Sequence, residues 1–393
     1  MSISFVIHSL EIPLVRPFRT SFGSQSVRDV VLVEAISDSG VSGWGECVTM
    51  AWPGYSAEYT RGAVNVMRDF LIPTLSPLLG VGGGSSSKGS SLKGSSLKGS
   101  SAEGSTPAPD SVRAALAVMQ GNPMAKSAIE TALLDLWLKE RNLSLGDFLG
   151  ATRDRVDCGV SVGIPNSIAD LIAEVGQYVE QGYRRIKLKV EPGWDLDALR
   201  AVRGEWPEIP LQVDANQAYR RSDADHLAKF DEFDLLLIEQ PLPEDDLLGH
   251  KLISSVVETP ICLDESILSV DSAESAIEFG ATTIINIKPG RVGGFLNARD
   301  IHDLCVEKNI PVWCGGMLET GVGRAANIAL AALPGFILPG DTSASNRYYK
   351  EDVTEPFVLD HGQLSVPNGP GIGVEPIAVN LSGMSIATEH VEV

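Results

Sequence analysis

Eight short segments rich in β-branched residues alternate with amphipathic helical stretches from about residue 155 onward. In order they read VDCGVSVG, RRIKLKV, LQVDAN, LLLIEQP, ICLDES, TIINIKPG, PVWCGG and FILPGD. Strands that alternate with helices pair in parallel, because each crossover needs a helix to return the chain. Eight such units favour a closed barrel over an open sheet. The predicted fold class is α/β, with a TIM-like (β/α)-barrel.

Charged residues occur at a nearly constant interval along this part of the chain. Each lies at or near the carboxyl end of a predicted strand, and the intervals are 25, 25, 25 and 24 residues for Lys189, Asp214, Glu239, Asp264 and Lys288. One βα repeat of a barrel has about this length. The spacing therefore predicts that the five side chains meet at the barrel mouth, where barrel enzymes keep their active sites.

Three carboxylates that share one space repel one another unless a cation neutralises them. Asp214, Glu239 and Asp264 offer only oxygen ligands, with no His or Cys nearby, which indicates Mg²⁺ or Mn²⁺ rather than zinc. The two lysines flank this trio. A lysine beside a bound cation loses proton affinity and can act as a base near neutral pH.

The chemistry that fits is removal of a proton from the carbon next to a substrate carboxylate, with a divalent ion offsetting the charge that develops. The alternative is that these residues form only salt bridges among strand ends. Lys187 shares a face with Lys189 by strand alternation. It either tunes Lys189, contacts a substrate carboxylate or makes a simple ion pair.

The remainder of the chain predicts a second unit. Residues 1–130 are expected to form an α+β capping or lid domain, with paired strands at 30–36 and 43–47 and helices near 59–71 and 124–141, the last with an apolar stripe. Within it, residues 82–106 are a flexible Gly/Ser-rich tract resembling a linker. Residues 131–353 form the barrel, and residues 354–393 return to the capping domain.

Composition excludes several partners. The formal charge of −20 argues against nucleic acid and anionic membranes, both of which need a basic surface. Five widely spaced cysteines fit neither a disulfide framework nor a zinc site and are expected to be buried thiols. No signal peptide or spanning segment is recognisable, so the expected location is the cytoplasm.

The motifs at the strand ends resemble the muconate-lactonizing subgroup of the enolase superfamily. They are K-x-K (Lys187, Lys189), Asp with Asn two later (Asp214, Asn216), E-Q-P (Glu239), D-E-S (Asp264, Glu265) and NIKPGRVGG (Lys288). PFRTSFG, GWGECVTM, PVWCGGMLETGVGRAAN and LPGDTSAS further resemble the o-succinylbenzoate synthase/N-acylamino acid racemase family. The resemblance covers nearly the whole chain apart from the Gly/Ser tract.

The resemblance implies metal ligation by Asp214, Glu239 and Asp264, normally of Mg²⁺, and catalysis by Lys189 and Lys288 on opposite faces of a small carboxylate substrate. It also implies a homo-oligomer. The reaction is expected to be dehydration to o-succinylbenzoate for menaquinone synthesis, racemisation of N-acylated (N-succinyl) amino acids, or both. Supporting and substrate-binding roles fall to Lys187, Ser161, Asn216, Glu265, Gly316, Met317, Leu318 and Asp341, and lid roles to Phe18, Met50 and Tyr55.

Other functions stay open at this stage. A dipeptide epimerase or a muconate cycloisomerase of the same subgroup would use the same lysines and carboxylates. Dipeptide epimerases of the subgroup tend to carry D-x-D after the last strand, where this chain has Asp341-Thr342-Ser343. A catalytically silent barrel, kept as a binding or scaffold protein, would have lost a ligand or a base, and none is missing here.

Overall fold

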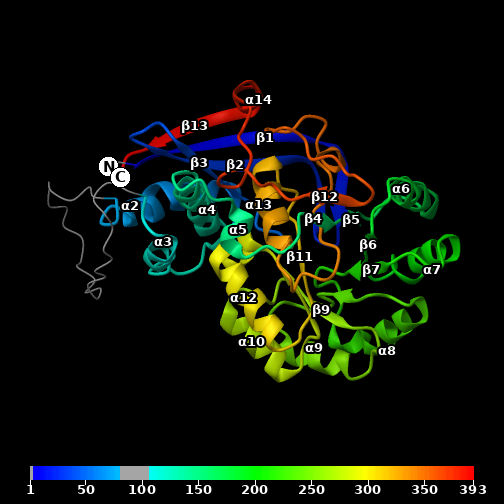
Figure 1. Cartoon of the computed structure of the whole chain (residues 1–393). Coiled ribbons are helices and arrows are strands. Elements are labelled where there is room, and N and C mark those ends of the chain that lie inside the picture. Colours follow the sequence, from blue (N-terminus) through cyan, green and yellow to red (C-terminus); the bar gives the residue numbers. More distant parts are fainter. Residues whose placement is uncertain (1–2, 80–105) are drawn as a thin grey trace.

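The computed structural model describes residues 3–79 and 106–393. The predicted flexible tract, except for its last residue, lies outside these ranges. A four-stranded antiparallel sheet and a seven-stranded parallel sheet organise the chain. Figure 1 shows the antiparallel sheet against one side of the larger body, which carries the parallel strands and their helices. The predicted fold class, a TIM-like barrel with a capping domain built from both ends of the chain, is confirmed.

The capping sheet has the order β13-β1-β2-β3. Its strands are β1 (Ile3–Thr20), β2 (Gly23–Ser37), β3 (Ser42–Cys47) and β13 (Ser385–Val391). β13 pairs with β1, so the last strand of the chain completes the first sheet, as Figure 1 shows in red beside blue. The accompanying helices are α1 (Thr60–Val66), the π-helix η1 (Met67–Leu71), α2 (Ile72–Thr74), α3 (Pro109–Leu116), α4 (Pro123–Lys139) and α5 (Leu145–Leu149).

Helix α4 joins the two units. The sequence predicts a single apolar stripe for it, but most of its faces are buried, including Ser127, Glu130, Thr131 and Asp135. The reason is that α4 packs on β3 of the capping sheet and also on the barrel helices α11 (Pro289–Val292) and α12 (Phe295–Glu307). The predicted domain boundary at residue 130 falls inside this helix, and the division into domains stays a prediction.

The barrel sheet runs in sequence order from β5 to β11, with every neighbouring pair parallel. Its strands are β5 (Gly159–Val162), β6 (Arg185–Lys189), β7 (Leu211–Asp214), β8 (Ile238–Glu239), β9 (Ile261–Leu263), β10 (Ile284–Ile287) and β11 (Val312–Cys314). The helices between and after them are α6 (Ile168–Glu180), α7 (Leu196–Glu205), α8 (Ala224–Leu227), η3 (Ala228–Phe233), α9 (Leu247–Ser254), α10 (Val270–Phe279), α12 and α13 (Gly321–Ala331).

The eighth predicted strand, FILPGD, is not a regular strand. Phe336 makes an isolated parallel bridge to Val312 on one side, and Gly340 makes one to Cys158 on the other. Pro339 has no N–H to donate, which prevents a continuous ladder through this segment. The segment still touches both edges of the seven-stranded sheet, so it closes the barrel with isolated bridges.

Smaller elements complete the chain. They are β4 (Arg155–Asp157) paired with β12 (Gln363–Ser365), the 3₁₀ turns η2 (Arg221–Asp223) and η4 (Ser345–Arg347), and α14 (Ala378–Met384). The first predicted barrel segment, VDCGVSVG, is therefore divided between β4 and β5. All five cysteines are buried and unpaired. Within the described ranges, no helix has the length and apolarity needed to cross a membrane.

Candidate active site

The charged residues that recur along the sequence end neighbouring barrel strands. Lys189, Asp214 and Glu239 are the last residues of β6, β7 and β8, and their Cα atoms are partners across the sheet. Asp264 and Lys288 directly follow β9 and β10. Parallel pairing thus brings the five to one edge of the barrel, because the carboxyl ends of all strands face the same way.

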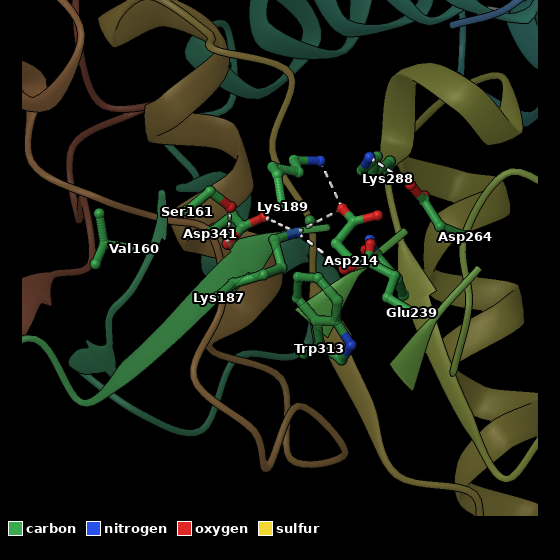
Figure 2. Close-up of polar contacts among 12 residues, drawn as sticks. Val160, Ser161, Lys187, Lys189, Asp214, Glu239, Asp264, Lys288, Trp313 and Asp341 are labelled. Atoms are coloured by element: carbon green, nitrogen blue, oxygen red, sulfur yellow. Dashed lines mark hydrogen bonds and ion pairs between the residues drawn. The ribbon is translucent and has the colours of Figure 1, made fainter. Parts of the chain in front are cut away.

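The two lysines contact different carboxylates. Lys189 Nζ donates to Asp214 Oδ2 at 2.6 Å and to Asn216 Oδ1 at 2.7 Å. Lys288 Nζ donates to Asp264 Oδ2 at 2.7 Å and to the Tyr55 hydroxyl at 3.2 Å. Figure 2 shows the Lys189–Asp214 and Lys288–Asp264 ion pairs as two separate contacts. Both lysine side chains also line one pocket.

Lys187 lies below this pair, buried among three carboxylates. Its Nζ is 2.7 Å from Asp341 Oδ2, 3.0 Å from Glu239 Oε2 and 3.4 Å from Asp214 Oδ2, and it lies over the Trp313 ring (Figure 2). Burial opposes the charge of Lys187, but the three carboxylates outweigh burial and raise its pKa above the usual range. Lys187 is therefore a fixed cation that holds several anions together.

The carboxylates respond to the same charges. Burial would raise the pKa of Asp214, but Lys189 and Lys187 outweigh it and lower that pKa to about 2. Burial and the nearby Asp214 charge raise the pKa of Glu239 and bring that of Glu265 to about 7. Burial also disfavours the charge of Lys288, yet the surrounding Tyr55 and acidic groups raise its pKa. This direction is opposite to the lowered pKa expected for a lysine beside a bound cation, because Tyr55 and the nearby carboxylates favour the charged form of Lys288.

The predicted metal ligands are chemically suited to a hard divalent cation. Asp214, Glu239 and Asp264 are buried oxygen donors at the ends of successive strands, and Glu265 Oε2 beside them is buried without a hydrogen-bond partner among the described residues. As the side chains stand, however, no three acidic, His or Cys residues of the described chain are grouped closely enough to hold an ion. Lys187 separates Asp214 from Glu239, and Asp264 faces Lys288 and Arg291. The ligand set stays a prediction.

The pocket at this edge is lined from both units. The predicted residues that line it are Phe18, Met50, Tyr55, Ser161, Lys187, Lys189, Asn216, Lys288, Gly316, Met317, Leu318 and Asp341. The remaining predicted residues, Asp214, Glu239, Asp264 and Glu265, are buried next to it and do not line it. Asn216 Nδ2 donates to Glu265 Oε1 at 3.0 Å, which links the pocket wall to this buried layer.

Several residues of the site were not predicted from the sequence. Arg185 shares the inward face of β6 with Lys187 and Lys189, so the same alternation could have indicated it. Arg291, in the NIKPGR motif, contacts Asp264 and lies 3.4 Å from the Tyr55 hydroxyl. Trp313 on β11 lies beneath Lys187. Arg28 lines the pocket from β2, and no local pattern in the sequence indicates it.

The strand ends of this (β/α)-barrel carry two lysines on either side of buried carboxylates, and a second domain lines the same pocket. These features are typical of an enzyme that carries out acid–base chemistry at the barrel mouth. Comparison with known proteins makes the class specific. Residues 170–378 match the family model described as enolase C-terminal domain-like.

The similarity extends over nearly the full chain. An N-succinylamino acid racemase from Amycolatopsis sp is 53% identical over 97% of this chain and 96% of its own. An o-succinylbenzoate synthase from Geobacillus kaustophilus is 44% identical over 95% and 94%. A crystal structure of an enolase superfamily member from Listeria innocua superposes with a TM-score of 0.87 at 37% identity, covering 99% of this chain and 98% of that one.

The chain belongs to the enolase superfamily, in the family that contains the o-succinylbenzoate synthases and N-succinylamino acid racemases. This confirms the resemblance found in the motifs, and it establishes that the protein is an enzyme. Enzymes of this superfamily depend on a divalent metal ion.

Proposed function

We propose that this enzyme removes the proton next to the carboxylate of a small-molecule acid. It uses this step to racemise N-succinylamino acids and to catalyse the dehydration that forms o-succinylbenzoate. The observation that carries the proposal is that Lys189 and Lys288 reach one pocket from strands on either side of the buried carboxylates. Two bases on opposite faces of one carbon are what racemisation needs, and one of them suffices for dehydration.

Each residue has a defined part in this proposal. Lys189 takes the proton, and Asn216 and Asp214 hold its Nζ in place. Lys288 delivers or takes a proton on the opposite face, or stabilises the developing anion as a cation. Asp214, Glu239 and Asp264 would hold Mg²⁺, for which Mn²⁺ or another divalent ion can substitute. When bound, the metal supplies positive charge that offsets the second negative charge formed on the substrate carboxylate.

The pocket walls bind and orient the substrate. Ser161, Asn216 and the Gly316–Leu318 segment lie on the barrel side, and Phe18, Met50 and Tyr55 close the pocket from the capping domain. Glu265 and Asp341 act indirectly, through Asn216 and Lys187 respectively. Exclusion of water by the apolar lid residues strengthens the electrostatic interactions inside.

Substitution of the lysines tests the catalytic roles. Lys189→Ala is expected to reduce exchange with D₂O by about 10²- to 10⁴-fold for the enantiomer whose α-proton faces Lys189, the range that a general base contributes. Lys288→Ala is expected to stop racemisation in both directions. The matched control is Lys251→Ala on the surface helix α9, which should exchange normally. If Lys189→Ala exchanges both enantiomers at the wild-type rate, Lys189 is not a base of this enzyme.

Metal binding is tested separately from activity. Adding Mg²⁺ to protein treated with EDTA should raise the unfolding temperature, because a ligand that binds only the folded state stabilises it. Asp264→Asn should lose most of this rise, and the exposed Asp360→Asn should retain it. An equal rise in both variants would exclude Asp264 as a ligand.

We further propose that the enzyme is a cytoplasmic homo-oligomer that binds no nucleic acid. The acidic balance of 51 Asp+Glu against 31 Lys+Arg supports the last part, and the family resemblance supports the first two. Light scattering on the purified protein measures the subunit number, and a monomer at micromolar concentration would contradict the oligomer.

A further inference from the structure

Arg28 on β2 is a buried cation in the wall of the pocket. The residue is 1% exposed, and it lines the pocket together with Lys187, Lys189 and Lys288. Nη1 donates to the Thr49 carbonyl at 2.6 Å and Nη2 to the Val48 carbonyl at 2.8 Å. Nε is buried and has no hydrogen-bond partner among the described residues. The guanidinium thus keeps unused N–H donors at the pocket wall.

Arg28 differs from most other buried arginines in its lack of a counter-charge. Arg185 pairs with Asp341, Arg291 with Asp264 and Arg347 with Glu174. No carboxylate of the described chain lies within 4.0 Å of Arg28, and its neighbour Asp29 points to the other face of β2 by strand alternation. A buried charge without a partner is costly, so such a site is suited to an anion that arrives with a ligand.

Arg324 provides a comparison. It is also buried without a carboxylate partner, but it donates to the Ser343 and Glu319 carbonyls and does not line the pocket. Among the buried arginines of the described residues, Arg28 therefore combines two properties, an unneutralised charge and a place in the pocket wall.

The pocket takes positive charge from both domains. The three lysines come from the barrel, where the proton next to the substrate carboxylate would be removed, and Arg28 comes from the capping sheet. The other residues that line the pocket include the apolar Phe18, Phe22, Met50, Met317 and Leu318. This pattern fits a substrate with two anionic ends joined by an apolar spacer.

We propose that Arg28 binds a second, distal carboxylate of the substrate, so that the enzyme selects N-acylamino acids whose acyl group itself ends in a carboxylate. This inference rests on the proposed function and adds the residue that recognises the acyl end. Because Arg28 also holds the Val48 and Thr49 carbonyls next to Met50, binding of the distal carboxylate ties the acyl group to the part of the capping domain that closes the pocket.

The test compares two substrates that differ only at the acyl end. The N-succinyl and N-succinamyl derivatives of one amino acid carry a carboxylate and a neutral amide at the same position. Wild-type kcat/KM for α-proton exchange is expected to be roughly 10- to 100-fold higher for the succinyl derivative, the range of a charge-assisted hydrogen bond. Arg28→Met should lose this preference, so that its kcat/KM values for the two derivatives become nearly equal.

Two further variants complete the design. Arg324→Met is the matched control and should keep the wild-type preference, even if it lowers the amount of folded protein. Arg28→Lys keeps a cation but loses the planar pair of donors, so the preference should fall by at least about threefold. If Arg28→Met does not fold, the preference measured for Arg28→Lys decides whether Arg28 binds the distal carboxylate.

Failure of this inference is distinct from failure of the proposed function. A wild-type enzyme that exchanges both derivatives equally, or an Arg28 variant that keeps the full preference, overturns the role of Arg28 and leaves the proton abstraction standing. A wild-type enzyme that exchanges neither derivative overturns both.

Discussion

Asp341 connects two cations that the rest of the site depends on. Its Oδ1 lies 2.9 Å from Arg185 Nη1, and its Oδ2 lies 2.7 Å from Lys187 Nζ. Burial would raise the pKa of Asp341, but Lys187 and Arg185 outweigh burial and hold that pKa well below its usual range. Asp341 also accepts a hydrogen bond from Ser161 at 3.3 Å. It therefore positions Lys187 and the pocket wall together.

Replacing Asp341 should be costly for stability. Asp341→Asn leaves Arg185 and Lys187 with less counter-charge in a buried place, and the expected loss in the free energy of unfolding is about 3 kcal/mol or more. Urea unfolding measures it. The control is Asp360→Asn, which removes the ion pair between the exposed Asp360 carboxylate and Arg155. This change should lower the free energy of unfolding by less than about 1 kcal/mol. Equal losses in the two variants would contradict the structural role given to Asp341.

At the scale of elements, capping-domain carboxylates satisfy the N-termini of barrel helices. Glu46 on β3 accepts hydrogen bonds from Thr320 N, Thr320 Oγ1 and Gly323 N at the start of α13. Glu130 on α4 accepts one from Leu296 N at the start of α12. Free N–H groups at a helix N-terminus need such acceptors. Helix α13 follows the Gly316–Leu318 pocket segment, so Glu46 joins the capping domain to that segment.

Glu46 predicts a pH dependence of stability. Burial is the main reason that its pKa rises from 4.5 to about 7, and the nearby Glu319 adds to the rise. A raised acid pKa means that the contribution of Glu46 is complete below about pH 4.5 and is lost as the pH rises through 7. Between pH 4.5 and 8, the wild type should therefore lose on the order of 3 kcal/mol relative to Glu46→Gln, which cannot ionise.

Urea unfolding of both proteins at several pH values in this window measures the difference. Glu355→Gln removes an exposed carboxylate and serves as the control, with a difference from wild type that does not depend on pH. If the free energies of unfolding of Glu46→Gln and the wild type change in parallel across this pH window, ionisation of Glu46 does not contribute to the pH dependence of stability.

Contact between β3 and α4 requires a residue without a side chain. A Cβ atom on Gly45 would collide with the Ala128 carbonyl and lie 2.8 Å from Ala132 N, both backbone atoms of α4. Gly45→Ala is expected to lower the free energy of unfolding by about 2–3 kcal/mol, as overpacking of a rigid contact does. Gly204→Ala, in open space on α7, should instead raise it by up to about 1 kcal/mol. Shifts in the urea midpoint separate the two outcomes.

At the scale of the whole molecule, the two ends of the chain meet in one sheet. β13 covers the edge of β1, and most of its residues are exposed, with Val391 buried. Ending the chain after Met384 should lower the unfolding temperature by only a few degrees, since little apolar surface is lost, but it uncovers the N–H and C=O groups of β1. Light scattering should then detect association that a chain ended after Val391 does not show. Absence of association would mean that β13 does not protect the edge.

Local sequence patterns predicted much of the fold and part of the site. The repeat of about 25 residues placed Lys189, Asp214 and Glu239 on successive strand ends, because parallel strands of equal repeat length stand in register. The pairing of the strands near 30–36 and 43–47 also followed from their alternation. The eighth strand was predicted too regularly, since Pro339 limits it to isolated bridges.

The sequence alone determined the architecture and which chemical groups stand at the barrel mouth, since periodicity and strand order are local properties. Only the tertiary structure decided which charges pair with which. Lys187 joins Asp341, Glu239 and Asp214 from different strands, and Arg28 enters the pocket from the other domain with no carboxylate partner among the described residues. The physical reason is that a charge in a buried site is governed by whatever lies within a few ångströms, and those neighbours come from residues far apart in the chain.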